Sequence, residues 1–252
     1  MILMKQERVQ ERIGFVFIHG AGLEGRVWEQ VTDGLGFPAL LANFPLRDNT
    51  YESRRKLTLQ DYVRHIRDQV MEWNADRIVL VAHSLGGVLA LQLAVELSGR
   101  LAGFVAVSAA IPKQGGSFLS TLPRPQRILL PILLRTAGTR PPASAIRSGL
   151  CSDVSAEQAE DIVRGFVPES VRVYTDRIDA SALEVPRLYI RLKQDKQFSL
   201  SLQNKMITNL SPQHVYDLDA GHLPMLSQPD QLRAMLQRFM TEAVYPFSSQ
   251  KW

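Results

Sequence analysis

Residues 78–87 read Ile-Val-Leu-Val-Ala-His-Ser-Leu-Gly-Gly, an apolar β-branched run that ends abruptly at a serine flanked by small residues. The run predicts a buried strand, and the apolar spacing after it predicts a helix. Ser84 then lies at the apex of a sharp turn, where Ala82 and Gly86 are small enough for strand and helix to pass closely. Such a turn presents a serine hydroxyl as a nucleophile. An ordinary strand-to-helix turn, with glycines for backbone freedom, is the alternative interpretation.

Outward from this segment, the chain alternates predicted strands and helices. This alternation is typical of an α/β fold with a mostly parallel central sheet and helices on both faces. We expect helices at 26–35, 59–73, 88–97, 155–165 and 229–244, and strands at 14–19, 38–43, 77–82, 103–108, 187–192 and 214–218.

The alternation stops over residues 110–185, which are rich in Pro, Leu and Ile. We expect a single domain over residues 1–252, with 110–185 inserted as a helical cap over the carboxyl edge of the sheet. A helical layer that only pads the sheet is the alternative. The apolar run 127–135 supplies more apolar side chains than a short helix needs, so Leu129 and Leu133 are predicted to line a substrate pocket.

Length and composition indicate a soluble enzyme-sized domain. The chain has 252 residues, 45% hydrophobic and 21% charged, with no long linker and no run of about 18 apolar residues that would predict a membrane span. Charged residues near the start predict no signal peptide, and the single Cys151 excludes an intrachain disulfide, so we expect a cytoplasmic protein. The basic residues behind the net charge of +4 are scattered, which argues against nucleic acid as a partner. Without a His/Cys/Asp cluster at ligand spacing, we expect no metal and no cofactor.

A serine hydroxyl needs a base, and that base needs an acid to fix its tautomer. Two histidines lie far downstream of Ser84. His222 follows the last predicted strand, in a loop that can return over the sheet edge, whereas His214 begins that strand and is committed to a sheet face. We therefore predict His222 as the base.

The acid is expected just beyond the penultimate predicted strand, residues 187–192. Asp195 has this position, in Leu-Tyr-Ile-Arg-Leu-Lys-Gln-Asp-Lys. Asp217 and Asp219 are rivals because they are near His222 in sequence, but they lie on or at the end of its own strand. We favour Asp195, for which a helix-capping role is the alternative.

The third requirement is a pair of backbone N–H groups that bind the oxyanion. We predict Leu85, the residue after the nucleophile, and Ala21, in the glycine-rich loop after the first strand. That loop has neither of the common phosphate-binding glycine spacings.

These segments together resemble the α/β-hydrolase group that holds plant methylesterases, hydroxynitrile lyases and bacterial carboxylesterases. The resemblance is carried by four motifs: Phe-Ile-His-Gly-Ala-Gly, Ala-His-Ser-Leu-Gly-Gly, Tyr-Ile-Arg-Leu-Lys-Gln-Asp-Lys and Gly-His-Leu-Pro-Met-Leu-Ser-Gln-Pro. It implies the same triad and oxyanion donors as the chemical reasoning. The residues beside them, Gly20, His83 and Leu223, are expected to contact substrate.

Two activities within that group are separated by two positions. The lyases resembled have a threonine after the first-strand histidine and a lysine after the catalytic histidine, where this chain has Gly20 and Leu223. Leucine cannot stabilise a departing cyanide, so a serine carboxylesterase acting on small to medium uncharged esters is favoured. Lactone, thioester or amide hydrolysis on the same triad stays open, and a non-catalytic binding protein would be expected to have lost a triad member. We expect a small-molecule ester and no membrane as partner, and a homodimer stays open.

Overall fold

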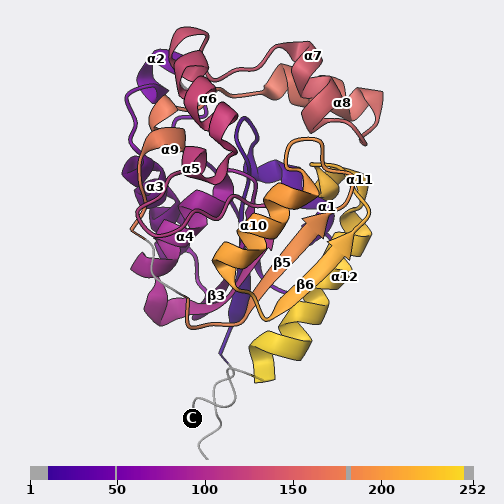
Figure 1. Ribbon diagram of the computed structural model, residues 1–252. Coiled ribbons are helices and arrows are strands. Elements are labelled where there is room, and N and C mark those ends of the chain that lie inside the picture. Colours follow the sequence, from indigo (N-terminus) through magenta and orange to yellow (C-terminus); the bar gives the residue numbers. More distant parts are fainter. Residues whose placement is uncertain (1–10, 49, 180–182, 247–252) are drawn as a thin grey trace, which may run out of the picture.

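Six strands form one parallel sheet in the computed structural model, which describes residues 11–48, 50–179 and 183–246 (Figure 1). The strand order is β2-β1-β3-β4-β5-β6, and every neighbouring pair runs parallel. The strands are β1 (Ile13–Ile18), β2 (Ala39–Ala42), β3 (Arg77–His83), β4 (Leu101–Val107), β5 (Arg187–Leu192) and β6 (His214–Leu218). The predicted α/β fold is confirmed.

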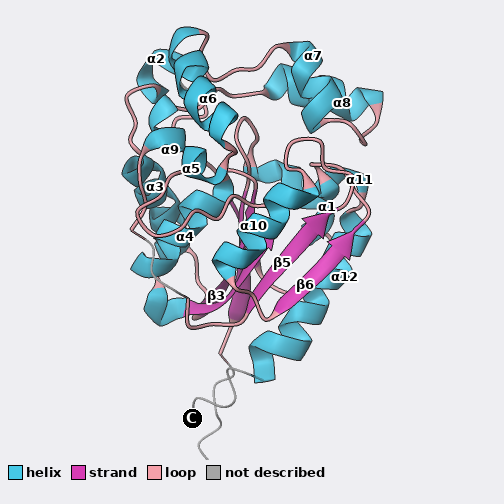
Figure 2. Cartoon of the chain, in the orientation of Figure 1, coloured by secondary structure: helices cyan, strands magenta, loops and turns pink. Residues whose placement is uncertain are grey.

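Helices cover both faces of this sheet (Figure 2). Side chains alternate along each central strand: in β1, Val16 packs with one apolar cluster, whereas Phe15 and Phe17 pack with the other. The first cluster includes residues of α3 (Leu59–Glu72), α4 (Gly86–Glu96) and α10 (Leu200–Leu210). The second includes residues of η1 (Gly25–Trp28), α1 (Glu29–Thr32), α11 (Pro224–Ser227) and α12 (Pro229–Phe239). Burial on both faces explains why the central strands read as continuous apolar runs.

Two predicted helices differ from those observed. The helix expected over 26–35 is the 3-10 turn η1 followed by the short α1, and Gly34 and Gly36 beyond it have positive φ values of 71° and 77°. Such values favour glycine and end a right-handed helix. The helix expected over 229–244 changes at its end from α12 to the π-helical turn η4 (Met240–Val244).

The segment between β4 and β5 contains α5 (Phe118–Thr121), α6 (Arg124–Thr136), α8 (Ala156–Gly165) and α9 (Val171–Thr175), beside the 3-residue α7 (Ala143–Ala145) and the π-helical turn η3 (Ile146–Leu150). Within this segment, the helices α6, α7 and α8 lie beyond the tips of the strand arrows in Figure 1. The short α2 (Tyr51–Arg54) lies at the same end of the molecule. Within the three described ranges, none of the helices is both long and apolar enough to cross a bilayer.

Candidate active site

Ser84 lies at the turn between β3 and α4, with a strained backbone. Its φ is +53°, which is rare outside glycine and costs about 1–3 kcal/mol. The turn is crowded by the neighbouring strand, because a Cβ on Gly86 would lie 2.6 Å from the carbonyl oxygen of His19. The small residue expected at position 86 therefore has a steric reason, and the strain presents the hydroxyl at the sheet edge.

His222 joins Ser84 to Asp195 through two hydrogen bonds. The serine Oγ lies 3.0 Å from His222 Nε2, and His222 Nδ1 lies 2.7 Å from Asp195 Oδ2. An ionised carboxylate can only accept a hydrogen bond, so Nδ1 of His222 must carry the ring proton and donate it to Asp195. Nε2 then has a free lone pair that can accept the proton of the serine hydroxyl. This geometry can deprotonate a hydroxyl.

Four hydrogen bonds hold Asp195 at the end of β5. Its Oδ1 accepts from the backbone N–H groups of Gln197 at 2.7 Å and Phe198 at 2.9 Å, and its Oδ2 accepts from Ser108 Oγ at 2.6 Å and from His222. Burial disfavours the charged carboxyl, but the adjacent histidine and these donors outweigh it and lower the pKa of Asp195. The carboxylate thus stays ionised beside the imidazole.

The rival acids lie elsewhere. Asp217 forms an exposed ion pair with Arg191 at 2.8 Å, and Asp219 accepts from the side chain of Gln194 at 3.0 Å. Neither has a hydrogen bond to His222 in the described part of the chain.

Two residues beside the serine have backbone N–H groups that are available for an oxyanion. Ala21 and Leu85 both line the cavity around Ser84, and neither N–H has a hydrogen-bond partner among the described residues. The peptide that carries the Ala21 N–H is fixed on its other side, because His19 Nδ1 lies 2.8 Å from the carbonyl oxygen of Gly20. A trans peptide points its N–H and C=O in opposite directions, so this bond turns the N–H of Ala21 away from His19.

His83 is a buried neighbour of the triad with its own partner. Its Nε2 lies 2.8 Å from the carbonyl oxygen of His222, so this ring supports the loop that carries the base. Burial, together with the nearby His222, lowers the pKa of His83 to about 3. His83 is therefore neutral at ordinary pH and acts as a fixed donor.

The cavity over Ser84 has a volume of about 250 Å³ and lies between the sheet edge and the cap segment, residues 110–185. Gly20 and His83 line it, and contact between these two residues and a substrate stays a prediction. Its other walls are mainly apolar, and none of the described residues that form them is a Lys, Arg, Asp or Glu: they include Phe118, Leu130, Leu134, Ile146, Phe166, Tyr174 and Phe198.

Three predicted substrate contacts are corrected. Leu129 and Leu133 are 64% and 55% exposed on the outer side of α6, and the next residue in each case, Leu130 and Leu134, lines the cavity instead. Every residue from 128 to 134 in this helix is apolar, so the pattern there does not distinguish the two sides. Leu223 is fully buried in the apolar cluster that includes residues of α12, and it is not among the residues that line the cavity.

Sequence reasoning missed several residues of the site. The aromatic wall of Phe118, Tyr174 and Phe198 comes from three separate elements, so no local pattern reveals it. Ser108 could have been found, because it is the last residue of the strand expected over 103–108 and therefore lies at the carboxyl edge of a parallel sheet. Among the described residues, no group of three His, Cys, Asp or Glu is arranged to hold a metal ion.

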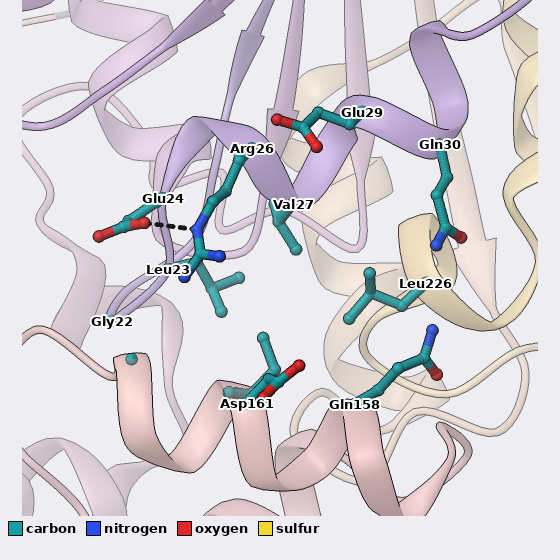
Figure 3. Close-up of a pocket in the computed structure, with 12 residues that line it drawn as sticks. Gly22, Leu23, Glu24, Arg26, Val27, Glu29, Gln30, Gln158, Asp161 and Leu226 are labelled. Atoms are coloured by element: carbon teal, nitrogen blue, oxygen red, sulfur yellow. Dashed lines mark hydrogen bonds and ion pairs between the residues drawn. The ribbon is translucent and has the colours of Figure 1, made fainter.

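A second cleft of about 330 Å³ lies outside the triad. Figure 3 shows Gln158 and Asp161 of α8 on one side, with Glu29 and Gln30 of α1 on the other. Among the described residues that line it, none is a serine, histidine or cysteine, so the cleft offers no counterpart to the Ser84–His222 pair. Leu23 lines both spaces, and the cleft is thus separated from the catalytic cavity by the loop after β1.

Known proteins share both this sequence pattern and this fold. Residues 15–235 match the profile of the alpha/beta hydrolase family. The chain belongs to the alpha/beta hydrolase family. Family membership supports an enzyme of the hydrolase class, as the sequence predicted.

The relatives of this alpha/beta hydrolase are distant. It is 27% identical over 246 residues to the biotin biosynthesis bifunctional protein BioHC of Cellvibrio japonicus, covering 89% of this chain and 47% of that protein. It is 27% identical over 246 residues to the putative chloroplastic methylesterase 11 of Arabidopsis thaliana, covering 88% and 62%. The chain thus spans about half to three fifths of these relatives. An extracellular alpha/beta-hydrolase of a Paenibacillus species superposes with a TM-score of 0.79 at 18% identity, covering 92% of this chain and 99% of that one, which shows a shared fold.

Proposed function

We propose that this alpha/beta hydrolase is a serine carboxylesterase that acts on small to medium uncharged esters. The observation that carries the proposal is the hydrogen-bonded series Ser84–His222–Asp195, which opens into a cavity beside two unpaired backbone N–H groups. Methylesterases among the relatives support esters as substrates. A cytoplasmic location remains part of the proposal, supported by the absence of any second cysteine in the sequence.

The proposed reaction proceeds through an acyl-enzyme. Ser84 Oγ attacks the ester carbonyl carbon while its proton passes to His222 Nε2, and the carbonyl oxygen becomes an oxyanion held by the N–H groups of Ala21 and Leu85. The carbon–oxygen bond to the alcohol then breaks, and His222 returns the proton to the leaving alcohol. Water, deprotonated by the same imidazole, attacks the acyl carbon and releases the carboxylic acid, which restores the serine.

The cavity supports the proposed substrate class. The described residues of its walls include no Lys, Arg, Asp or Glu, so an ionic group on the substrate would lose its hydration without gaining an oppositely charged partner there. Each methylene buried there adds about 0.8 kcal/mol until the space is full. We therefore expect kcat/KM for p-nitrophenyl esters to peak at about four to eight acyl carbons and to fall steeply for palmitate.

Cyanohydrin cleavage is disfavoured by Gly20 and Leu223, where the lyases resembled have threonine and lysine. A departing cyanide needs a cation beside it, and the residue after His222 is the apolar, fully buried Leu223. The described residues that line the cavity include no Lys or Arg in its place.

The testing experiment combines an ester series with a label. Purified protein is assayed on p-nitrophenyl esters of increasing chain length and on mandelonitrile, and is then treated with an organophosphonate and analysed by mass spectrometry. We expect ester hydrolysis, no cyanide release above background, and one adduct on Ser84. An adduct on a different residue, cyanide release that requires Ser84, or activation at a lipid interface would each contradict the proposal.

A further inference from the structure

A buried carboxylate from the cap segment reaches the loop that carries the oxyanion donor. Glu169 lies between α8 and α9, and its side chain is fully buried. Its Oε1 accepts from the backbone N–H of Gly22 at 3.2 Å and lies 2.7 Å from Arg47 Nη2, while Oε2 accepts from the hydroxyl of Tyr62 at 3.0 Å. One cap side chain thus joins the β1 loop to α3.

The same stretch of the cap holds Gly22 on its other side. The backbone N–H of Val167 donates to the carbonyl oxygen of Gly22 at 3.0 Å, so the two residues form a β-bridge. Gly22 has a φ of +78°, and the ring of Phe166 occupies the space that any side chain there would need. Both polar groups of this glycine are therefore bound by residues 166–169.

These bonds bear directly on the neighbouring residue, Ala21. The peptide before Ala21 is fixed by His19 and the peptide after it by Glu169, so its N–H direction depends on both anchors. The carboxylate is also paired with Arg47, which keeps an uncompensated negative charge away from the place where the oxyanion forms.

We propose that Glu169 is a positioning residue that orients the Ala21 N–H for the oxyanion, with Arg47 neutralising its charge. The inference rests on the proposed function, because it assigns a part of that same reaction. A displaced donor stabilises the oxyanion less but leaves ground-state binding intact. The signature is therefore a lower kcat at unchanged KM.

The experiment removes the carboxylate together with its cation. In the double variant Glu169→Leu with Arg47→Met, no buried charge is left unpaired. Glu160 and Arg147 form an exposed pair at 2.7 Å in the same cap segment, so Glu160→Leu with Arg147→Met is the matched control. Both proteins are assayed on p-nitrophenyl butyrate, and their affinity is measured for a trifluoromethyl ketone, which forms a tetrahedral oxyanion on Ser84.

We expect the Glu169 double variant to lose about 10²-fold in kcat and a similar factor in ketone affinity, with KM unchanged and the control variant unaffected. A folded Glu169 double variant with wild-type kcat, or a lower kcat with unchanged ketone affinity, would overturn the inference.

A second variant with a milder change tests the inference if the Glu169 double variant does not fold. Tyr62→Phe removes one donor to Glu169 and should lower kcat and ketone affinity together, by about 3- to 10-fold at constant KM. Unchanged values would overturn the inference equally. A wild-type protein that hydrolyses no ester contradicts the proposed function alone, because ketone affinity still reports on the loop.

Discussion

The sheet and α6 of the cap are built from the same kinds of apolar residue, yet they bury them differently. Every residue of β1 and β4 is buried, whereas Ile128, Leu129, Ile132 and Leu133 of α6 are more than half exposed. Helices press on the sheet from two sides, but α6 is covered on one side only. The groups proposed for chemistry are therefore fixed by the sheet edge, while α6 contributes shape, and substitutions in the two regions should differ in size.

The largest effect is expected at the sheet edge itself. Ser84→Ala removes the proposed nucleophile and should lower kcat for p-nitrophenyl acetate by about 10⁴-fold or more, because the three groups act as a unit. A folded variant that keeps a tenth of the activity would place the chemistry elsewhere. Circular dichroism checks the fold.

The second largest effect on kcat is expected for Asp195, the proposed acid of the triad. Asp195→Asn should cost about 10³- to 10⁴-fold in kcat, since an amide can no longer fix the tautomer of His222. Asp217→Asn, which breaks only an exposed ion pair, is the control and should change kcat less than twofold. The assignment is wrong if the control is the more damaging change.

The buried histidines under the sheet edge make stability depend on acidity. Burial lowers the pKa of both His19 and His83 in the folded protein, His83 to about 3. The unfolded chain takes up a proton near pH 6.5 whereas the folded one does not, so the free energy of unfolding falls as pH drops below 6.5. The slope is about 1.4 kcal/mol per pH unit for each histidine.

Urea unfolding between pH 7 and 4.5 measures this slope. His83→Gln, which can still donate to the carbonyl of His222, should make the dependence shallower by about that amount. An unchanged slope in this variant would show that His83 does not cause the acid sensitivity.

The smallest effect is expected in α6. Leu134→Ala widens the cavity and should lower kcat/KM for p-nitrophenyl hexanoate relative to acetate by up to about 10-fold. Leu133→Ala, one residue earlier and exposed, should leave that ratio unchanged and alter stability by less than about 0.5 kcal/mol. Equal effects at both positions would remove the distinction between the two sides of the helix.

The same contrast explains what could be predicted from the sequence. Strand bounds and the position of Ser84 follow from local patterns: β5 and β6 have the expected ranges, β5 as a largely buried strand and β6 as a partly exposed strand at the edge of the sheet. The Ser84–His222–Asp195 geometry joins loops that each follow a predicted strand. Position relative to a strand end favoured Asp195 over Asp217, and in the structure Asp195 is the one of the two that contacts His222.

The rest depends on contacts that no local pattern encodes. Leu129 and Leu130 are chemically the same, and only tertiary packing decides which one meets the cavity. The hydrogen-bond partners of the Glu169 side chain lie 107 to 147 residues away in the chain, so no local motif marks this residue. Sequence patterns predict the structure of residues that are close together in the chain, whereas these side chains meet only in the folded protein.

The interlock of Gly22 and Phe166 has a consequence for engineering this enzyme. Because the ring of Phe166 fills the space next to Gly22, the residue at one position has to fit the residue at the other, although the two lie far apart in the sequence. A cap grafted from another hydrolase would place a different residue against Gly22. The loop that carries Ala21 would then lose the hydrogen bonds that Val167 and Glu169 make to Gly22. Chimeras should therefore exchange residues 166–169 and 20–22 together, and a graft boundary drawn at the cap's sequence limits alone would inactivate the product.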